Sequence, residues 1–270
     1  MTITVRALTI YPVKSLAGIA LESATLESMG LQYDRRWMLV SPSGDFLSQR
    51  SVPKMALIQP KFIKQQLVLT TAQQADLVVP VADAQQTLQV TIWKDRVTAQ
   101  CVGAVADQWL SSALGIPCHL VYIPDDEIRP CDPEFSQQGD RTGFADAFPL
   151  LLISTASLDN LNQHLEQRLQ QPVTMQRFRP NIVVEGCAAF AEDRWRDFTL
   201  GNIPMRGVKR CSRCILTTVD PKTGKRTGAE PLQTLMRYRK RGKNVYFGQN
   251  VIHDAIGNIR RGDPIILKTN

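Results

Sequence analysis

Two cysteines three positions apart are the residues of this chain with the clearest chemical potential. Cys211 and Cys214 lie among Lys209, Arg210 and Arg213. Neighbouring cations favour the thiolate, which is the form of cysteine that acts as a nucleophile and as a soft metal ligand. We therefore expect that the reactive group of this chain lies in this segment and that it is the thiol of Cys214.

The residues after Cys214 predict how the thiol is positioned. Ile215 to Val219 is short and rich in β-branched residues, which is typical of a strand, and Asp220 to Gly224 has the Pro and Gly placement of a turn. The pattern places Cys214 at the mouth of a strand.

The basic residues are concentrated around the same thiol. The formal net charge is +7, but residues 206–243 hold 12 Lys and Arg against two acidic residues, a net charge of +10 that leaves −3 for the remainder. Such a concentration indicates an anionic ligand or partner near Cys214, with a solvated basic face as the alternative.

Three other readings of this segment are weaker. A structural zinc site needs four ligands, usually as two close pairs, but there is no second C-x-x-C and no His at ligand spacing. A thioredoxin-like pair would open a helix instead of a strand. Arg237 to Lys243, with Tyr238 and Tyr246, has the cation and aromatic mix of nucleic-acid binding, but no RRM, KH or zinc-finger signature accompanies it. We do not expect nucleic acid as the partner.

The elements that must position these residues are mostly strands. The segments with alternating apolar residues are Thr4–Tyr11, Ile19–Glu27, Trp37–Ser41, Phe46–Gln49, Gln66–Thr71, Leu77–Val79, Thr87–Trp93, His119–Ile123, Asn181–Glu185, Phe198–Ile203 and Pro264–Lys268. Helices are predicted at Val102–Leu114, from a cap at Ser157, and at Pro231–Lys240. Residues 124–140 form a long polar loop. The fold class is α+β with strands dominant.

Length and composition set the remaining bounds. A chain of 270 residues exceeds the usual single domain of about 100–200 residues, so we expect two modules. No run approaches the roughly 18 apolar residues of a membrane span, and the N-terminus alternates like a strand and does not resemble a signal peptide. Six cysteines are too sparse for a disulfide scaffold. We expect a cytoplasmic protein.

Five motifs in order resemble the MOSC family, and within it the YcbX-type proteins and the mitochondrial amidoxime reducing components. They are Tyr11-Pro-Val-Lys14-Ser15, Tyr33-Asp-Arg35-Arg-Trp37, the run from Arg177 to Val184, the run from Cys211 to Gly224, and Phe247-Gly-Gln-Asn250. The resemblance implies an N-terminal β-rich domain over residues 1–120 and a MOSC β-barrel domain with peripheral helices over residues 121–270. It also implies a molybdopterin-type molybdenum cofactor.

The resemblance also implies a role for each matching residue. Cys214 matches the thiolate that coordinates molybdenum, whereas Cys211 is not expected to be a ligand. The positions that match cofactor contacts are Lys14, Ser15, Arg35, Arg179, Asn181, Ser212 and Arg213. Two sites depart from the amidoxime reducing components: Ala147 and Phe148 stand in place of a Thr-Ser pair, so contact there must be through backbone, and Asn250 stands in place of a tyrosine.

The activity that the resemblance implies is the reduction of N-hydroxylated compounds, such as hydroxylamines, amidoximes and N-hydroxylated bases. The chain has no C-x4-C-x2-C run for an iron–sulfur cluster, so we expect its electrons from a separate flavin or iron–sulfur protein. Two alternatives stay open at this point. One is a carrier of the cofactor or of persulfide sulfur on Cys214, as in the MOSC domains of cofactor sulfurases, and the other is a basic nucleic-acid-binding module.

Overall fold

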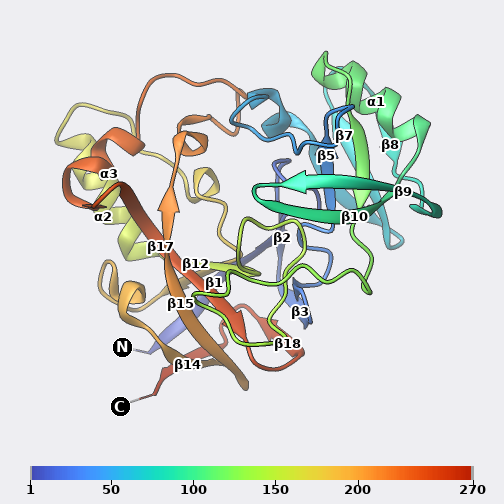
Figure 1. The fold of residues 1–270 in the computed structure, drawn as a ribbon. Helices are drawn as coiled ribbons and strands as arrows, with labels where there is room; N and C mark the ends of the chain where they lie inside the picture. Colours follow the sequence, from blue (N-terminus) through green and yellow to red (C-terminus); the bar gives the residue numbers. More distant parts are fainter. Residues whose placement is uncertain (1, 269–270) are drawn as a thin grey trace.

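The computed structural model describes residues 2–268, and its fold is α+β with strands dominant, as predicted. A seven-stranded barrel forms the larger part of the molecule (Figure 1). Around the barrel the strand order is β12-β13-β1-β19-β14-β15-β17, and β17 pairs back to β12 to close it. The strands are β1 (Ile3–Ile10), β12 (Leu150–Ser154), β13 (Ile182–Glu185), β14 (Asp197–Leu200), β15 (Ile203–Arg213), β17 (Asn244–His253) and β19 (Pro264–Leu267).

The barrel core follows from the alternation of apolar residues along these strands. In β1, Val5, Leu8 and Ile10 are buried, and they pack with residues such as Phe198 from β14 and Val251 from β17. Strand β12 differs because all five of its residues are buried. It runs parallel to β13, and a parallel pair requires a crossover, which here covers the outer face of β12.

That crossover contains α2 (Thr155–Glu166), which packs beside α3 (Leu232–Tyr238) on the outside of the barrel (Figure 1). The predicted cap at Ser157 was wrong. Ser154 caps α2 by accepting a hydrogen bond from the backbone N–H of Ser157, and the Ser157 hydroxyl instead donates to the buried Glu192 at 2.7 Å. No helix among residues 2–268 is long and apolar enough to cross a membrane.

A smaller module stands beside the barrel and has its own core. Its four-stranded sheet has the order β5-β11-β10-β9, and the helix α1 packs on β11 and on a three-stranded sheet, β6-β7-β8. The elements are β5 (Trp37–Val40), β6 (Gln59–Ile63), β7 (Gln66–Thr71), β8 (Gln74–Val78), β9 (Asp83–Ile92), β10 (Asp95–Cys101), α1 (Ala104–Leu114) and β11 (His119–Tyr122).

The strand predicted at residues 46–49 was wrong, because only Phe46 forms a single bridge, to Val40. The chain turns there instead. The carbonyl of Ser48 accepts from the backbone N–H groups of Ser51 and Val52, at 3.0 and 2.8 Å. The Ser48 hydroxyl also accepts from the backbone N–H of Arg50 at 3.3 Å, and such a local side-chain bond favours a turn over a strand. This turn leads Arg50 towards the barrel.

Chain order and spatial order differ at the N-terminus. Strand β1 is one of the barrel strands, between β13 and β19, and β2 (Ile19–Leu21) pairs with it. Strand β3 (Ser23–Glu27) pairs with β4 (Gly30–Leu31) and with β18 (Gly257–Arg260). Strands β1 to β4 therefore lie with the C-terminal strands, whereas Val13 and Leu16, in the loop between β1 and β2, pack in the core of the smaller module. The boundary near residue 120 stays a prediction about the sequence.

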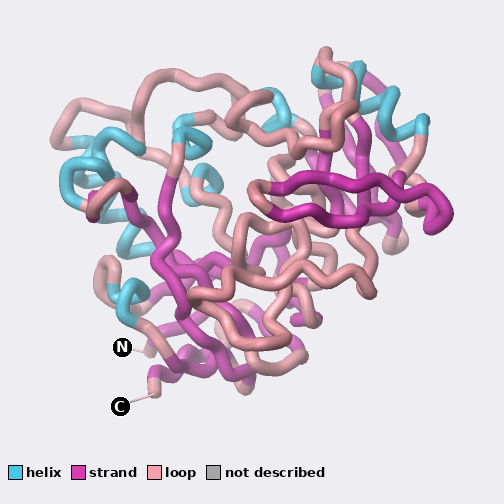
Figure 2. The backbone as a smooth tube through the Cα atoms, in the orientation of Figure 1, coloured by secondary structure: helices cyan, strands magenta, loops and turns pink. Residues whose placement is uncertain are grey.

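Long loops join the strands and approach the space between the two modules (Figure 2). The predicted polar loop is present: no helix or strand interrupts the described chain between β11 and β12. Towards its end, residues 145–148 line the cavity described next.

Candidate functional site

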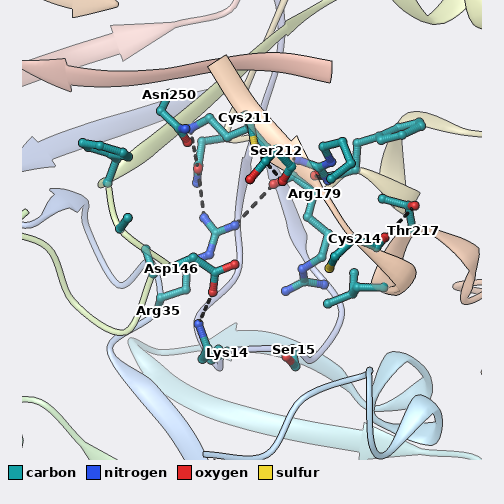
Figure 3. A pocket seen from close by; sticks show the side chains of 18 of the residues that line it. Lys14, Ser15, Arg35, Asp146, Arg179, Cys211, Ser212, Cys214, Thr217 and Asn250 are labelled. Atoms are coloured by element: carbon teal, nitrogen blue, oxygen red, sulfur yellow. Dashed lines mark hydrogen bonds and ion pairs between the residues drawn. The ribbon is translucent and has the colours of Figure 1, made fainter. Parts of the chain in front are cut away.

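A cavity of about 120 Å³ lies where the barrel and the smaller module meet (Figure 3). Its walls come from the loops after β1, β4 and β5, the loops before β12 and β13, the end of β15 with the turn that follows it, and Asn250 within β17. Every site residue predicted from the sequence lines it: Lys14, Ser15, Arg35, Ala147, Phe148, Arg179, Asn181, Ser212, Arg213, Cys214 and Asn250. The structure thus brings these residues together, and their individual roles stay predictions.

Cys214 reaches this cavity by a different route from the one predicted. The expected strand from Cys214 to Val219 was wrong: β15 ends at Arg213, and a 3-10 turn spans Ile215–Thr218. The hydroxyl of Thr217 donates to the Cys214 carbonyl at 3.0 Å, and that of Thr218 donates to the Ile215 carbonyl at 2.7 Å. Such local bonds favour a turn over a strand.

The two thiols of the C-x-x-C pair have different surroundings. Cys214 is exposed, whereas Cys211 is half-buried and its Sγ lies 3.0 Å from Nη1 of Arg213. Arg213 also donates from Nη2 to the carbonyl of Phe178 at 2.6 Å. Among residues 2–268 no three His, Cys, Asp or Glu side chains cluster as a metal site.

Two arginines lie against one aromatic ring in the cavity wall. The guanidinium carbons of Arg35 and Arg179 lie 4.5 and 4.1 Å from the centre of the Tyr11 ring. Arg35 is held by three neighbours, because Nη1 donates to Asp34 at 2.6 Å and to Asn181 at 2.8 Å, and Nη2 donates to the carbonyl of Arg179 at 3.3 Å. Asn181 is buried and acts here as a partner that orients Arg35.

Arg179 has a hydrogen-bond donor left over. Its Nη1 donates to the carbonyl of Leu16 at 2.6 Å, but its Nη2 is buried with no partner among the described residues. Burial lowers the pKa of Arg179 to about 10, and the nearby Tyr11 partly offsets this effect. A buried donor without an acceptor is costly, so Nη2 points to an acceptor supplied by a ligand.

Three of the nine non-glycine residues with positive φ among residues 2–268 line the same cavity. Ser15, Arg35 and Arg179 have φ angles of 70°, 48° and 58°, in the left-handed region that residues with side chains seldom adopt. Each such residue costs about 1–3 kcal/mol and persists where the surrounding structure fixes it, often at a functional site.

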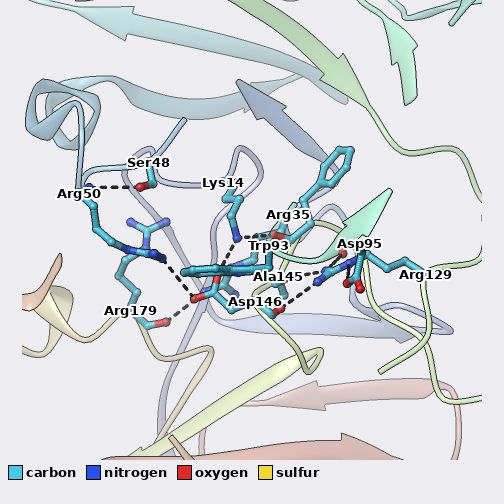
Figure 4. Close-up of polar contacts among 12 residues, drawn as sticks. Lys14, Arg35, Ser48, Arg50, Trp93, Asp95, Arg129, Ala145, Asp146 and Arg179 are labelled. Atoms are coloured by element: carbon cyan, nitrogen blue, oxygen red, sulfur yellow. Dashed lines mark hydrogen bonds and ion pairs between the residues drawn. The ribbon is translucent and has the colours of Figure 1, made fainter. Parts of the chain in front are cut away.

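Lys14 is a buried cation at the floor of the cavity (Figure 4). Its Nζ donates to the carbonyl of Phe144 at 2.8 Å and to Oδ1 of Asp146 at 2.6 Å. Burial lowers the pKa of Lys14 to about 8, although the attraction of Asp146 acts in the opposite direction. The charge of Lys14 is therefore sensitive to pH near neutrality.

Two further arginines at the site were not predicted from the sequence. Arg50 lines the cavity and lies 3.9 Å from Oδ2 of Asp146. Arg129 is buried and holds the neighbouring loop, donating to the carbonyls of Gly143, Ala145 and Asp146 at 2.8, 2.5 and 2.9 Å (Figure 4). Both lie in segments without a recognisable motif, and tertiary contacts alone bring them here.

The basic segment does not form one continuous cationic face. Arg206 pairs with Asp140 and Asp254, Lys209 pairs with Asp132, and Arg239 pairs with Asp193. The exposed cations at its C-terminal end are Arg237, Lys240, Arg241 and Lys243. Part of the predicted charge excess therefore stabilises loops, and part lines the cavity.

Comparison with known proteins agrees with this arrangement. Residues 2–117 match the MOSC N-terminal beta barrel domain, and residues 139–266 match the MOSC domain. The chain belongs to the MOSC family. This MOSC protein is 36% identical to mitochondrial amidoxime-reducing component 1 of Mus musculus and 34% identical to that of Homo sapiens, over 98% of this chain and 82% of each relative. It is 31% identical to mitochondrial amidoxime reducing component 2 of Bos taurus, over 97% of this chain and 82% of that relative.

Proposed function

We propose that this MOSC protein is a molybdenum-cofactor-dependent oxidoreductase that reduces N-hydroxylated compounds with electrons from a separate flavin or iron–sulfur protein. The observation that carries the proposal is the exposed thiol of Cys214 at a cavity lined by Lys14, Arg35 and Arg179. The names of its relatives, amidoxime-reducing components, support the substrate class.

The residues at the cavity fit such a cofactor. Nη2 of Arg179 and Nε of Arg213 are buried without an acceptor among the described residues, and phosphate oxygens or pterin ring edges are acceptors that suit a guanidinium. Lys14 adds a buried positive charge that an anion would stabilise. The thiol of Cys214 is the soft donor that a molybdenum centre requires.

Each residue would then hold a defined part of the cofactor. Lys14, Ser15, Arg35, Arg179 and Asn181 would bind the phosphate and pterin, and Cys214 would bind the metal. The neighbours Ser212, Arg213, Ala147, Phe148 and Asn250 would complete the wall. Ala147 offers only backbone groups, so the contact there differs from that of a hydroxyl side chain.

When bound, the cofactor supplies oxygen removal from the N–OH group, which uses two electrons and two protons and gives an amine or amidine and water. The protein supplies the setting for this chemistry. Buried cations offset the charge of the phosphate, the loop held by Arg129 fixes one wall, and the exposure of Cys214 leaves a side open to substrate.

The same exposed thiol favours a second function, in which Cys214 carries persulfide sulfur. The two functions differ in what the loaded protein does. A carrier releases sulfur or cofactor to an acceptor and does not reduce an amidoxime, whereas the enzyme does. The cytoplasmic location stays a prediction.

The test is metal and pterin analysis of gently purified protein, combined with a reduction assay. We expect molybdenum and a fluorescent pterin oxidation product in equal amounts, and conversion of benzamidoxime to benzamidine with an artificial one-electron reductant. Protein that contains molybdenum and pterin but leaves benzamidoxime unchanged would refute the enzymatic proposal and favour the carrier.

A further inference from the structure

A second and wider hollow, of about 680 Å³, opens beside the cavity. The two share eight residues, among them Cys214, Asp146 and Asn250, but Lys14, Arg35 and Arg179 line only the narrow cavity. A molecule in the wide hollow would therefore approach Cys214 from the side away from Lys14, Arg35 and Arg179. This separation provides one compartment for the cofactor and another for a substrate.

Trp93 stands at the rim of the wide hollow, at the tip of the hairpin between β9 and β10. Ile92 pairs with Asp95, so Trp93 and Lys94 form a two-residue turn. The φ angle of Trp93 is 56°, a left-handed conformation for which hairpin turns favour Gly or Asn. A bulky residue in this conformation is unusual and strained.

The indole ring is held in place yet remains accessible. Trp93 is 46% exposed. The guanidinium of Arg50 lies 4.2 Å from its ring, the Phe46 ring lies 5.1 Å away, and its N–H donates to Oδ1 of Asp146 at 3.4 Å (Figure 4). Since glycine would make this turn without strain, and since the exposed ring contributes little to the core, the position of Trp93 favours a role in binding.

We propose that Trp93 is a specificity-determining residue that packs against the planar, conjugated part of the substrate in the wide hollow. This proposal rests on the proposed function. Compounds with a π-face, such as aryl amidoximes and N-hydroxylated nucleobases, gain a stacking contact with Trp93, whereas aliphatic amidoximes of the same polarity do not. Stacking of a base on an aromatic side chain corresponds to roughly ten- to hundred-fold in affinity.

Binding can be measured without turnover, by ligand-observed NMR titration of the protein as purified, with no reductant. The probes are benzamidoxime and acetamidoxime, which share the reactive group and differ in the ring. Trp93→Gly removes the ring and suits the left-handed turn, so it should fold at least as well as the parent. Trp93→Phe keeps an aromatic ring and loses the N–H, and Trp109→Phe alters a tryptophan outside the hollow.

We expect Trp93→Gly to raise the Kd of benzamidoxime roughly tenfold or more, with little change for acetamidoxime. Trp93→Phe and Trp109→Phe should stay close to the parent. The proposal is overturned if Trp93→Gly weakens the binding of both compounds equally, or the binding of neither. It is also overturned if Trp93→Phe binds as weakly as Trp93→Gly, because the loss would then come from the hydrogen bond to Asp146 and not from the ring.

Turnover separates this inference from the proposed function. If neither compound is reduced by the parent protein, the proposed function fails, while the NMR titration still tests the stacking contact. If both compounds are reduced and Trp93→Gly changes kcat/KM equally for both, the proposed function stands and the role of Trp93 is refuted.

Discussion

The two thiols of the C-x-x-C pair differ in accessibility and in their partners, and this difference gives a sharp test of their roles. Cys214 is exposed at the cavity, whereas Cys211 lies against Arg213. Cys214→Ser should abolish molybdenum-dependent reduction, because a hydroxyl is a poor substitute for a soft thiolate. Cys211→Ser should retain much of it. Reduction rate and bound molybdenum are measured on both, and equal losses accompanied by bound zinc would contradict the assignment.

The buried Lys14 predicts a pH dependence for anion binding. Burial holds its pKa at about 8, so the folded protein carries this charge at pH 7 and loses it as the pH rises to 9. A charge-assisted hydrogen bond contributes about 1.5–3 kcal/mol, so the affinity of cofactor-free protein for sulfate should fall by up to roughly tenfold across this range, the factor by which the protonated fraction of Lys14 falls. Sulfate keeps its charge throughout, and calorimetry at pH 7, 8 and 9 gives the affinity.

The matched control for this prediction is Lys14→Arg, which stays protonated over the same range and should show a flat profile. The same shift has a consequence for stability. The folded pKa lies below the ordinary value of 10.5, so the buried charge disfavours folding below pH 8, and this cost disappears as the pH rises towards 10.5. A parent protein whose sulfate affinity does not change between pH 7 and 9 would show that Lys14 does not contact the anion.

At the scale of elements, the loop of residues 143–148 depends on Arg129. Its planar guanidinium donates to the carbonyls of Gly143, Ala145 and Asp146, a geometry that the point charge of lysine does not reproduce. Arg129→Lys should leave at least one buried carbonyl without a partner and lower the free energy of unfolding by about 1–3 kcal/mol. Urea unfolding measures this change, and faster proteolysis between residues 124 and 149 should accompany it. An unchanged unfolding midpoint and cleavage rate would mean that other contacts hold the loop.

The elements also differ in how well the sequence predicts them. The alternation of β1 predicts a strand correctly, and the spacing of Leu158, Leu161 and Leu165 predicts a helix correctly. Leu169 continues the same spacing, but it lies beyond the end of α2 and is 94% exposed. Strand β15 escaped prediction over most of its length because its register with β17 shifts after Gly207 and again after Arg210. Such bulges break the two-residue alternation on which strand prediction depends.

The residues of the candidate site could be predicted from the sequence where they belong to a recognisable motif. Motifs name Lys14, Arg35, Arg179 and Cys214, and the structure brings these residues to one cavity. Arg129 and its neighbours Arg50 and Trp93 carry no motif. They reach the site only because the smaller module packs against the barrel, and such tertiary contacts leave no local pattern in the sequence.

At the scale of the whole molecule, the pairing of β1 between β13 and β19 in the barrel brings the N-terminal motif to the site. The backbone N–H of Thr9 donates to the carbonyl of Asn181 at 2.9 Å, and the Tyr11 hydroxyl donates to the carbonyl of Pro180 at 3.2 Å. These bonds fix the N-terminal motif against a segment about 170 residues further along the chain. The pairing of β1 with β13 therefore holds the N-terminal motif and the Arg179 segment together at the cavity.

The exposed cations Arg237, Lys240, Arg241 and Lys243 give this molecule a candidate docking surface for an acidic electron donor. The surface is connected to the site through the sheet, because Val245 pairs with both Lys240 and Arg213, the residue before Cys214. We propose this surface as the dock. Arg239 is unsuitable for testing it, since its guanidinium is bound to the buried Asp193.

Charge reversal at Arg241→Glu and Lys243→Glu should slow turnover that is driven by a flavin or iron–sulfur reductase, by roughly tenfold or more at low salt. Turnover with a small artificial donor should not change, because that donor does not need the surface. The protein alone should not use a pyridine nucleotide, since its sequence has no G-x-G-x-x-G between a strand and a helix. The measurement is the rate of benzamidoxime reduction with each donor as the salt concentration is raised.

The control is the pair Lys64→Glu and Lys268→Glu, which changes the net charge by the same amount at exposed positions outside the surface. This pair should leave both rates near those of the parent, because steering depends on where the charge lies and only weakly on the total. If the rates with both donors fall together in the Arg241 and Lys243 variant, the surface serves the cofactor or the fold. If neither rate falls, or if the control pair slows the reductase equally, the donor docks elsewhere.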